Sequence, residues 1–114
     1  MTDRELLEAA AKAAGIEVWF PRLNGGKNPD GTRIILTPCY TEIDRVTVEW
    51  DPLTDDGDAL RLAVKLRMDI AHFHDFARAN IAIYDDCHEN NGDDPCAATR
   101  RAIVRAAAEM GKTK

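Results

Sequence analysis

Residues 94–110 form the segment that most constrains the fold. Asp94 is a preferred N-cap residue, and Pro95 suits the first position of a helix because its φ is already fixed. Gly111 follows the segment and is typical of a helix end. One long helix is therefore predicted, and its apolar face requires other elements to cover it. The apolar side chains that align on this face include Cys96, Ile103, Ala107 and Met110.

A second helix is predicted at the N-terminus, over residues 2–14. Thr2 and Glu5 have the spacing of a reciprocal capping box, and Gly15 suits a left-handed C-cap. Its apolar side chains form a narrow stripe of mostly small residues, which predicts that one face is buried. The stripe contains Leu6, Leu7, Ala10, Ala11 and Ala14.

A third helix is expected to begin within residues 51–58, where several carboxylates can accept bonds from free amide groups, and to run to about Arg67. Its apolar residues cover more than half of the circumference. We therefore expect it to be the most buried of the three helices. These residues are Ala59, Leu60, Leu62, Ala63, Val64 and Leu66.

The remaining segments predict strands. Residues 16–20 and 33–37 form a hairpin with a long loop, and residues 45–50 alternate between apolar and polar side chains as a third strand.

Residues 69–74 and 80–84 are a second strand pair joined around residues 76–78, and residues 88–93 are a loop. The expected order is αβββαββα. This order predicts a single α+β domain over residues 1–114, with a mostly antiparallel sheet and helices on one or both faces.

Length and charge limit the classes of function. The chain has 114 residues and a net charge of -5, which disfavours nucleic acid and anionic membranes as partners. No apolar run has the ~20 residues of a membrane helix, and the charged N-terminus differs from a signal peptide. The three cysteines are an odd number, which favours reduced thiols in the cytoplasm.

Three segments carry a sequence resemblance to a known family: ELLEAAAKAAGIE (residues 5–17), WDPLTDDGDALRLAVKL (50–66) and GDDPCAATRRAIVRAAAEMG (92–111). They resemble the phage ABA sandwich domain family, small phage or prophage proteins. The resemblance implies a three-layer α/β/α arrangement, a phage or prophage origin and a place in the host cytoplasm. It implies no particular activity or catalytic residue. Residues 19–44 do not follow the sequence pattern of the family.

Two groups of side chains raise the question of a metal or an enzyme site. Asp55, Asp56 and Asp58 offer hard oxygen ligands, but helix capping explains them better. His72, His74 and Cys87 offer nitrogen and sulfur ligands, without the paired spacing of a zinc site. We predict no catalytic residue, no metal and no cofactor.

Cys96 lies in the first turn of the last helix, where the helix dipole stabilises a thiolate. A nucleophile would also need a base. Because Cys96 aligns with the apolar face of its helix, we expect it to be buried by packing instead of reacting.

Candidate binding residues fall in two places. Trp19, Phe20, Arg22 and Tyr40 are aromatic and arginine anchors for a protein partner, beside a glycine-rich loop that contains Lys27. A plain loop and core explain the same residues.

Arg100 is the second place, because it lies on the margin of the apolar face of its helix. Its guanidinium must extend to solvent, pair with a carboxylate such as one within residues 55–58, or bind an anionic ligand. The loop with Arg22 and Lys27 is the other candidate site for such a ligand. Internal pairing is the favoured reading.

The expected function is that of a small phage-encoded accessory protein that binds a host or phage protein without catalysis, for example to block a host defence system. The alternative is a protein that binds or sequesters an anionic nucleotide signal. A metal-dependent hydrolase built on His72, His74 and Cys87 is the third and least favoured class. Association of the chain with copies of itself stays open.

Overall fold

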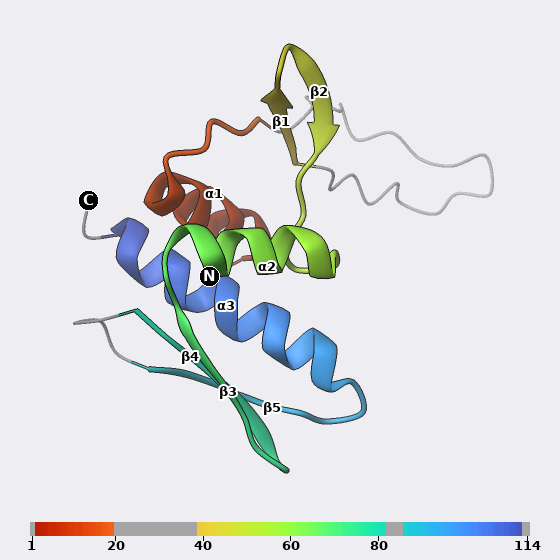
Figure 1. Cartoon of the computed structure of the whole chain (residues 1–114), viewed down its shortest axis with the longest axis vertical. Coiled ribbons are helices and arrows are strands. Elements are labelled where there is room, and N and C mark those ends of the chain that lie inside the picture. The colour runs from red at the N-terminus through yellow and green to blue at the C-terminus, as the bar shows by residue number, and fades with distance from the viewer. Residues whose placement is uncertain (1, 20–38, 82–85, 113–114) are drawn as a thin grey trace, which may run out of the picture.

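The computed structural model describes residues 2–19, 39–81 and 86–112. This part of the chain contains three helices and five strands in two antiparallel sheets (Figure 1). The α+β class predicted from the sequence is confirmed. In chain order the elements are α1 (Asp3–Ala14), β1 (Tyr40–Ile43), β2 (Val46–Glu49), α2 (Asp56–Lys65), β3 (Asp69–His72), β4 (Phe76–Asn80), β5 (Cys87–Asn90) and α3 (Pro95–Lys112).

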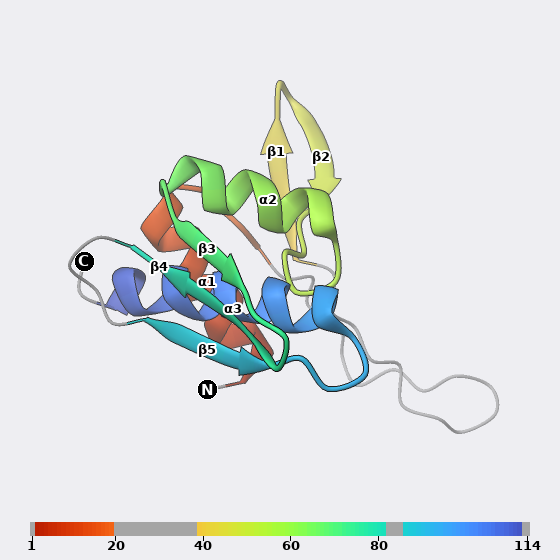
Figure 2. The same cartoon turned by 60° about the horizontal axis from the view of Figure 1, so that its bottom comes forward.

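Helix α3 is the element on which the others pack. Helices α1 and α2 both contact it, and so do β4 and β5 of the three-stranded sheet. Figures 1 and 2 show α1 and this sheet against different sides of α3. The resemblance implies helical layers on both faces of a sheet, whereas the described helices lie on one side of this one. The core along α3 includes Ala102, Ile103, Val104, Ala106 and Ala107.

The N-terminal ends of the helices follow the predicted caps. The Thr2 hydroxyl accepts a bond from the Glu5 amide, and the Asp94 carboxylate accepts one from the Ala97 amide. Gly15 closes α1 with a φ of 70°, in the left-handed region that favours glycine. Each of these signals is local, which is why the sequence predicts them correctly.

Gly111 does not end α3, contrary to the prediction. The helix continues to Lys112, and Gly111 lies where α3 meets α1. A Cβ atom added at Gly111 would lie 1.9 Å from the carbonyl oxygen of Ala9. The glycine is therefore required by the close approach of two backbones. In the sequence Gly111 looks like a residue that ends a helix, but it is needed for the contact between α3 and α1.

Helix α2 is shorter and more exposed than predicted. It ends at Lys65, and its Leu60 and Val64 are 60% and 68% exposed. Only Ala59, Leu62 and Ala63 are buried, because α2 rests on α3 along one face and no described element covers the opposite face. The prediction that α2 is the most buried helix is wrong, because α1 and α3 each bury a larger share of their residues.

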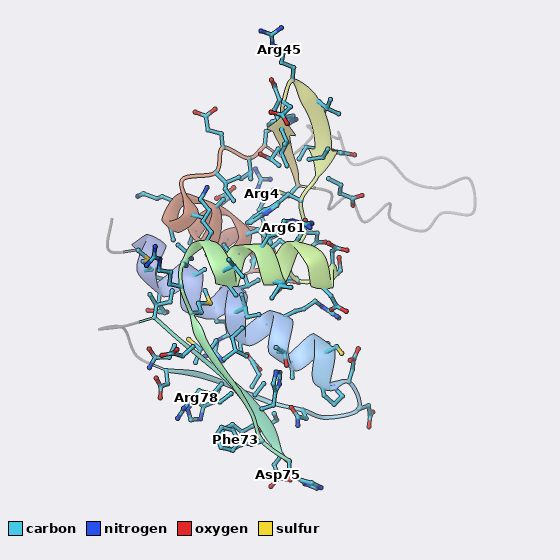
Figure 3. All side chains as sticks on the ribbon, viewed as in Figure 1. Arg4, Arg45, Arg61, Phe73, Asp75 and Arg78 are labelled. Atoms are coloured by element: carbon cyan, nitrogen blue, oxygen red, sulfur yellow. The ribbon has the colours of Figure 1, made fainter. Side chains whose placement is uncertain are left out.

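The two-stranded sheet is a hairpin formed by β1 and β2. Ile43 pairs with Val46, and the turn residues Asp44 and Arg45 have positive φ values of 51° and 67°. This is the backbone geometry that suits the twist of a tight hairpin. Figures 1 and 2 show the hairpin projecting from the helices, and Figure 3 shows Arg45 at its tip.

The strands predicted before this hairpin have a different outcome. Of residues 16–20, only Trp19 pairs, through an isolated bridge to Tyr40, and Phe20 lies outside the described residues. Residues 33–37 also lie outside them. The predicted strand 45–50 is confirmed as β2, but its partner is β1, a strand that was not predicted.

The three-stranded sheet has the order β3-β4-β5. The predicted strand 69–74 is confirmed as β3. The central strand β4 starts in the residues predicted to be a turn, and β5 begins at Cys87 and covers the start of the predicted loop 88–93. Of the strand predicted at residues 80–84, Asn80 is the last residue of β4, Ile81 belongs to no strand, and residues 82–85 are not described. The alanines of β4 have low strand propensity but fit closely against α3.

The outer face of this sheet carries a row of stacked rings. The centroids of Phe73 and Phe76 are 4.5 Å apart, and those of Phe76 and His88 are 5.1 Å apart. The Arg78 guanidinium lies 5.7 Å from the Phe73 ring, on the outer side of the sheet (Figure 3). These side chains cover one another and shield a face that no described helix covers.

We predict that Gly111→Ala destabilises the protein because the added methyl group must push α3 away from Ala9. Overpacking of this kind lowers the free energy of unfolding by about 1–3 kcal/mol. Denaturant unfolding followed by circular dichroism measures the change. The control is Gly57→Ala in the first turn of α2, where the three atoms nearest to the new methyl, at 3.2–3.3 Å, belong to the side chains of Arg61 and Asp55. Equal stability of the two variants would contradict the prediction.

Candidate functional site

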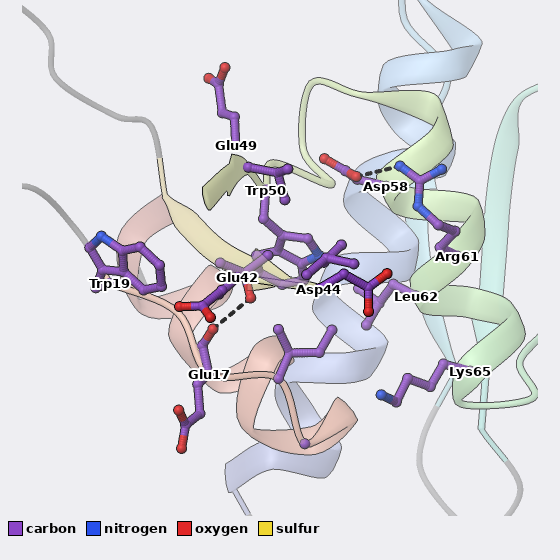
Figure 4. Close-up of a pocket in the computed structure, with 15 residues that line it drawn as sticks. Glu17, Trp19, Glu42, Asp44, Glu49, Trp50, Asp58, Arg61, Leu62 and Lys65 are labelled. Atoms are coloured by element: carbon purple, nitrogen blue, oxygen red, sulfur yellow. Dashed lines mark hydrogen bonds and ion pairs between the residues drawn. The ribbon is translucent and has the colours of Figure 1, made fainter. Parts of the chain in front are cut away.

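A cleft lies between the β1–β2 hairpin and helix α2. It has a volume of about 830 Å³, and the segment after α1 forms its third wall (Figure 4). Its size is within the range of ligand and peptide sites in proteins.

Three sets of hydrogen bonds fix the base of the hairpin. The Thr41 hydroxyl donates to the Glu17 carbonyl at 2.7 Å, and the backbones of Trp19 and Tyr40 exchange two bonds of 2.9 Å. The Trp50 amide donates to the Cys39 carbonyl at 2.7 Å. Hydrogen bonds therefore hold the backbone of the hairpin in place at the base of the cleft.

Apolar side chains form much of the cleft and its surroundings. Trp50 and Leu62 are buried at its floor, whereas Trp19 and Ile43 are 41% and 57% exposed. Val46 is exposed on the same hairpin. Large apolar side chains that stay exposed around a cleft are typical of surfaces that bind another molecule.

The charges around the cleft are mostly negative. Five carboxylates and two cations line it, and Arg61 is already bound to Asp58 at 2.6 Å. Lys65 is the other cation. The potential in the cleft therefore favours a partner with basic groups. The five carboxylates belong to Glu17, Glu42, Asp44, Glu49 and Asp58.

Two of the predicted partner-binding residues meet at this cleft. Trp19 lines it, and the centroid of the Tyr40 ring lies 6.5 Å from that of Trp19. Phe20, Arg22 and Lys27 lie outside the described residues. Sequence reasoning missed Trp50, Ile43 and the charged side of α2. Those residues reach the cleft because β1 pairs with β2 and because α2 lies across the cleft from the hairpin, and the sequence has no local signal for either arrangement.

Arg100 pairs internally, as the sequence favoured. Its Nη1 lies 2.5 Å from the Asp56 carboxylate, and its Nε donates to the Leu53 carbonyl at 2.9 Å. The acidic run that contains Asp56 is otherwise occupied by capping, since Asp55 accepts the Asp58 amide at 2.8 Å. A ligand-binding role for Arg100 stays a prediction.

The two arginines one turn apart on the outward side of α3 are also paired. Arg105 donates to Glu89 at 2.7 Å and to the His88 carbonyl at 3.0 Å, and the bond to Glu89 raises the pKa of Arg105. Arg101 lies 3.3 Å from Asp3 and 3.7 Å from Glu89. These pairs join α3 to β5 and α1.

His72, His74 and Cys87 do not meet. His72 points toward α3, where its Nδ1 lies 3.5 Å from the Thr99 hydroxyl, and the side chain of His74 is fully exposed beside Asp75. Cys87 is buried and pairs across the sheet with Ala79. In the three described stretches of chain, no three His, Cys, Asp or Glu side chains are grouped to hold a metal ion.

The cysteines differ in exposure. Cys96 is exposed, so the prediction that packing buries it is wrong. It lies in the first turn of α3 and lines a groove together with Ile70 and His72 of β3. Cys39 is buried, and desolvation raises the pKa of its thiol to about 12, with smaller contributions from Asp51 and Glu8.

Comparison of the chain with protein-family models, curated proteins and solved structures gives no match. Among the residues that the structure describes, no helix combines the length and the apolar character needed to cross a membrane.

We predict that iodoacetamide labels Cys96 first in the native protein. Cys39 and Cys87 are buried, and the raised pKa of Cys39 keeps its thiol neutral, so both should react only after unfolding. Mass spectrometry of the digested protein measures each site, with a sample in denaturant as the control. Labelling of Cys39 as fast as Cys96 in the native state would contradict this burial pattern.

The raised pKa of Cys39 also predicts a pH dependence of stability. The thiol ionises at an ordinary pKa of 9.0 in the unfolded chain and at about 12 in the folded one. Its contribution is therefore fully present below pH 9.0 and is lost as the pH rises toward 12, because the unfolded state releases the proton first. Cys39→Ala should show a shallower loss of unfolding free energy over this range, and Cys96→Ala the same loss as wild type. Parallel curves for all three proteins would refute the assignment.

Proposed function

We propose that this chain acts by binding another protein through the cleft between the β1–β2 hairpin and α2. The observation that carries the proposal is the exposure of large apolar side chains, Trp19 and Ile43 among them, around a cleft whose backbone is fixed by hydrogen bonds. Aromatic residues at the centre of an apolar surface are typical of the positions that dominate binding energy.

The partner would present a small number of apolar side chains with lysine or arginine beside them. Apolar groups would be buried against Trp19, Ile43 and Trp50, and basic groups would face the excess of carboxylates. Such charge complementarity mainly speeds association and selects the partner, whereas the apolar contacts supply most of the affinity. The complex should therefore associate more slowly at high salt.

The biological setting comes from the resemblance to the phage ABA sandwich domain family. On that basis the partner is a host or phage protein, and the binding is non-enzymatic, for example as a block on a host defence system. The short chain is compatible with such a role because one standard interface uses ~800 Å² of each partner, about a tenth of the surface of a small protein.

We predict that Ile43→Glu abolishes partner capture. The tagged protein is used to isolate partners from phage-infected cells, and the affinity of the purified partner is then measured by calorimetry. A charge placed among the apolar contacts should weaken binding at least about tenfold, which corresponds to roughly 1.4 kcal/mol. The matched control is Val64→Glu, an equally drastic change at an exposed position of α2 outside the cleft.

Two results would count against the proposal. One is a partner whose affinity falls equally in the two variants, since the contact would then lie elsewhere or depend on overall charge. The other is the absence of any stoichiometric partner from several hosts. Circular dichroism of both variants checks that they remain folded.

A further inference from the structure

A second surface is formed by strand β3, the edge strand of the three-stranded sheet. Its inner side pairs with β4, and no other described strand pairs with its outer side. An edge of this kind presents backbone N–H and C=O groups that can bond to another extended chain.

The register shows which backbone groups of β3 face outward. The Phe73 amide donates to the Phe76 carbonyl at 2.9 Å, so this pair is hydrogen-bonded. Bonded and non-bonded pairs alternate along an antiparallel ladder. The next pair inward, His72 with Ala77, is therefore non-bonded, and so is Ile70 with Ala79. The peptide groups of Ile70 and His72 consequently point away from β4, toward the free edge.

The side chains of these two residues line a groove beside that edge. The groove has a volume of about 360 Å³ and lies between β3, helix α2 and the first half of α3. Leu60 of α2, Ile103 of α3 and Ile70 of β3 are among its apolar lining residues. Leu60 is one of the most exposed large apolar side chains among the described residues, so a molecule bound in the groove would pack against it.

One end of the groove carries an excess of negative charge. Asp56 and Asp94 flank Arg100, with oxygen to nitrogen distances of 2.5 Å and 4.0 Å. The carboxylate side chains are 72% and 62% exposed, whereas that of Arg100 is 15% exposed. A partner that reaches this end therefore meets two carboxylates, with the single cation largely covered.

We infer that β3 accepts an extended peptide segment as a fourth strand. The segment would bond to the backbone of Ile70 and His72, place alternate apolar side chains in the groove, and set a lysine or arginine against Asp56 and Asp94. Addition of a strand to an exposed sheet edge is a general mode of peptide recognition, in which backbone bonds give affinity and side-chain pockets give specificity. This surface is separate from the hairpin cleft, and its occupant goes beyond the function proposed there.

The probes are two short synthetic peptides that alternate valine and threonine and carry lysine at the first or the last position, so that both strand directions are tested. NMR titration follows the backbone amides. We expect one peptide to shift the amides of Ile70 and His72 and to slow their hydrogen exchange. Replacing its lysine with glutamate should weaken binding at low salt.

His72→Pro removes one outward N–H group without removing a bond to β4, and edge positions tolerate proline. We expect this variant to bind the peptide about tenfold more weakly, since one backbone hydrogen bond to the peptide is lost. His72→Val is the matched control, which retains the N–H group, and it should bind within about twofold of wild type. Equal affinity of His72→Pro and wild type would overturn the inference.

A change in the peptide tests the same inference without any variant of the protein. N-methylation of alternate peptide bonds blocks strand pairing in one register and leaves the side chains in place. We expect one of the two methylated forms to lose binding at the β3 edge. Binding of both forms would show side-chain docking without strand addition, and the absence of amide shifts at β3 with either peptide would remove the site altogether. Neither outcome affects the hairpin cleft, which Ile43→Glu tests.

Discussion

The close approach of α1 and α3 is the constraint on which the rest of the structure depends. The two helices meet through small side chains, and at Gly111 the backbones come so near to Ala9 that no Cβ atom fits. Close packing of this kind fixes the distance and angle between two helices, because side chains that have no rotamers leave little freedom to adjust. With α1 in place on one side of α3, the three-stranded sheet packs on another side, and α2 also packs on α3 with one face uncovered.

The two candidate binding surfaces both follow from the position of α2. One side of this helix supplies Arg61 and Lys65 to the hairpin cleft, and another supplies Leu60 to the groove beside β3. The helix is held by Leu62 in the core and, through the segment before it, by the bond between Arg100 and the Leu53 carbonyl. A helix that is buried along a single face can thus form part of two surfaces without being the centre of the core.

Charged residues in this chain are used mainly for internal order. Arg100 and Arg105 are bonded to carboxylates and to backbone carbonyls of other elements, which orients α3 against α2 and β5. The excess of acidic residues then remains at the hairpin cleft and at the exposed end of the groove. A net negative chain can in this way present two acidic surfaces of modest size, each suited to basic groups of a partner.

The sequence by itself determined the helices and their N-terminal ends, because the caps at Thr2 and Asp94 depend on contacts between near neighbours. It also favoured an internal carboxylate as the partner of Arg100, since a charge at the margin of an apolar face costs free energy when it is left unpaired. Only the tertiary structure decided which strands pair, that Val64 is exposed, and that Gly111 serves a helix contact instead of a helix end. Strand pairing and burial are contacts between distant parts of the chain, and the short alanine-rich strand β4 has no local pattern that reveals them.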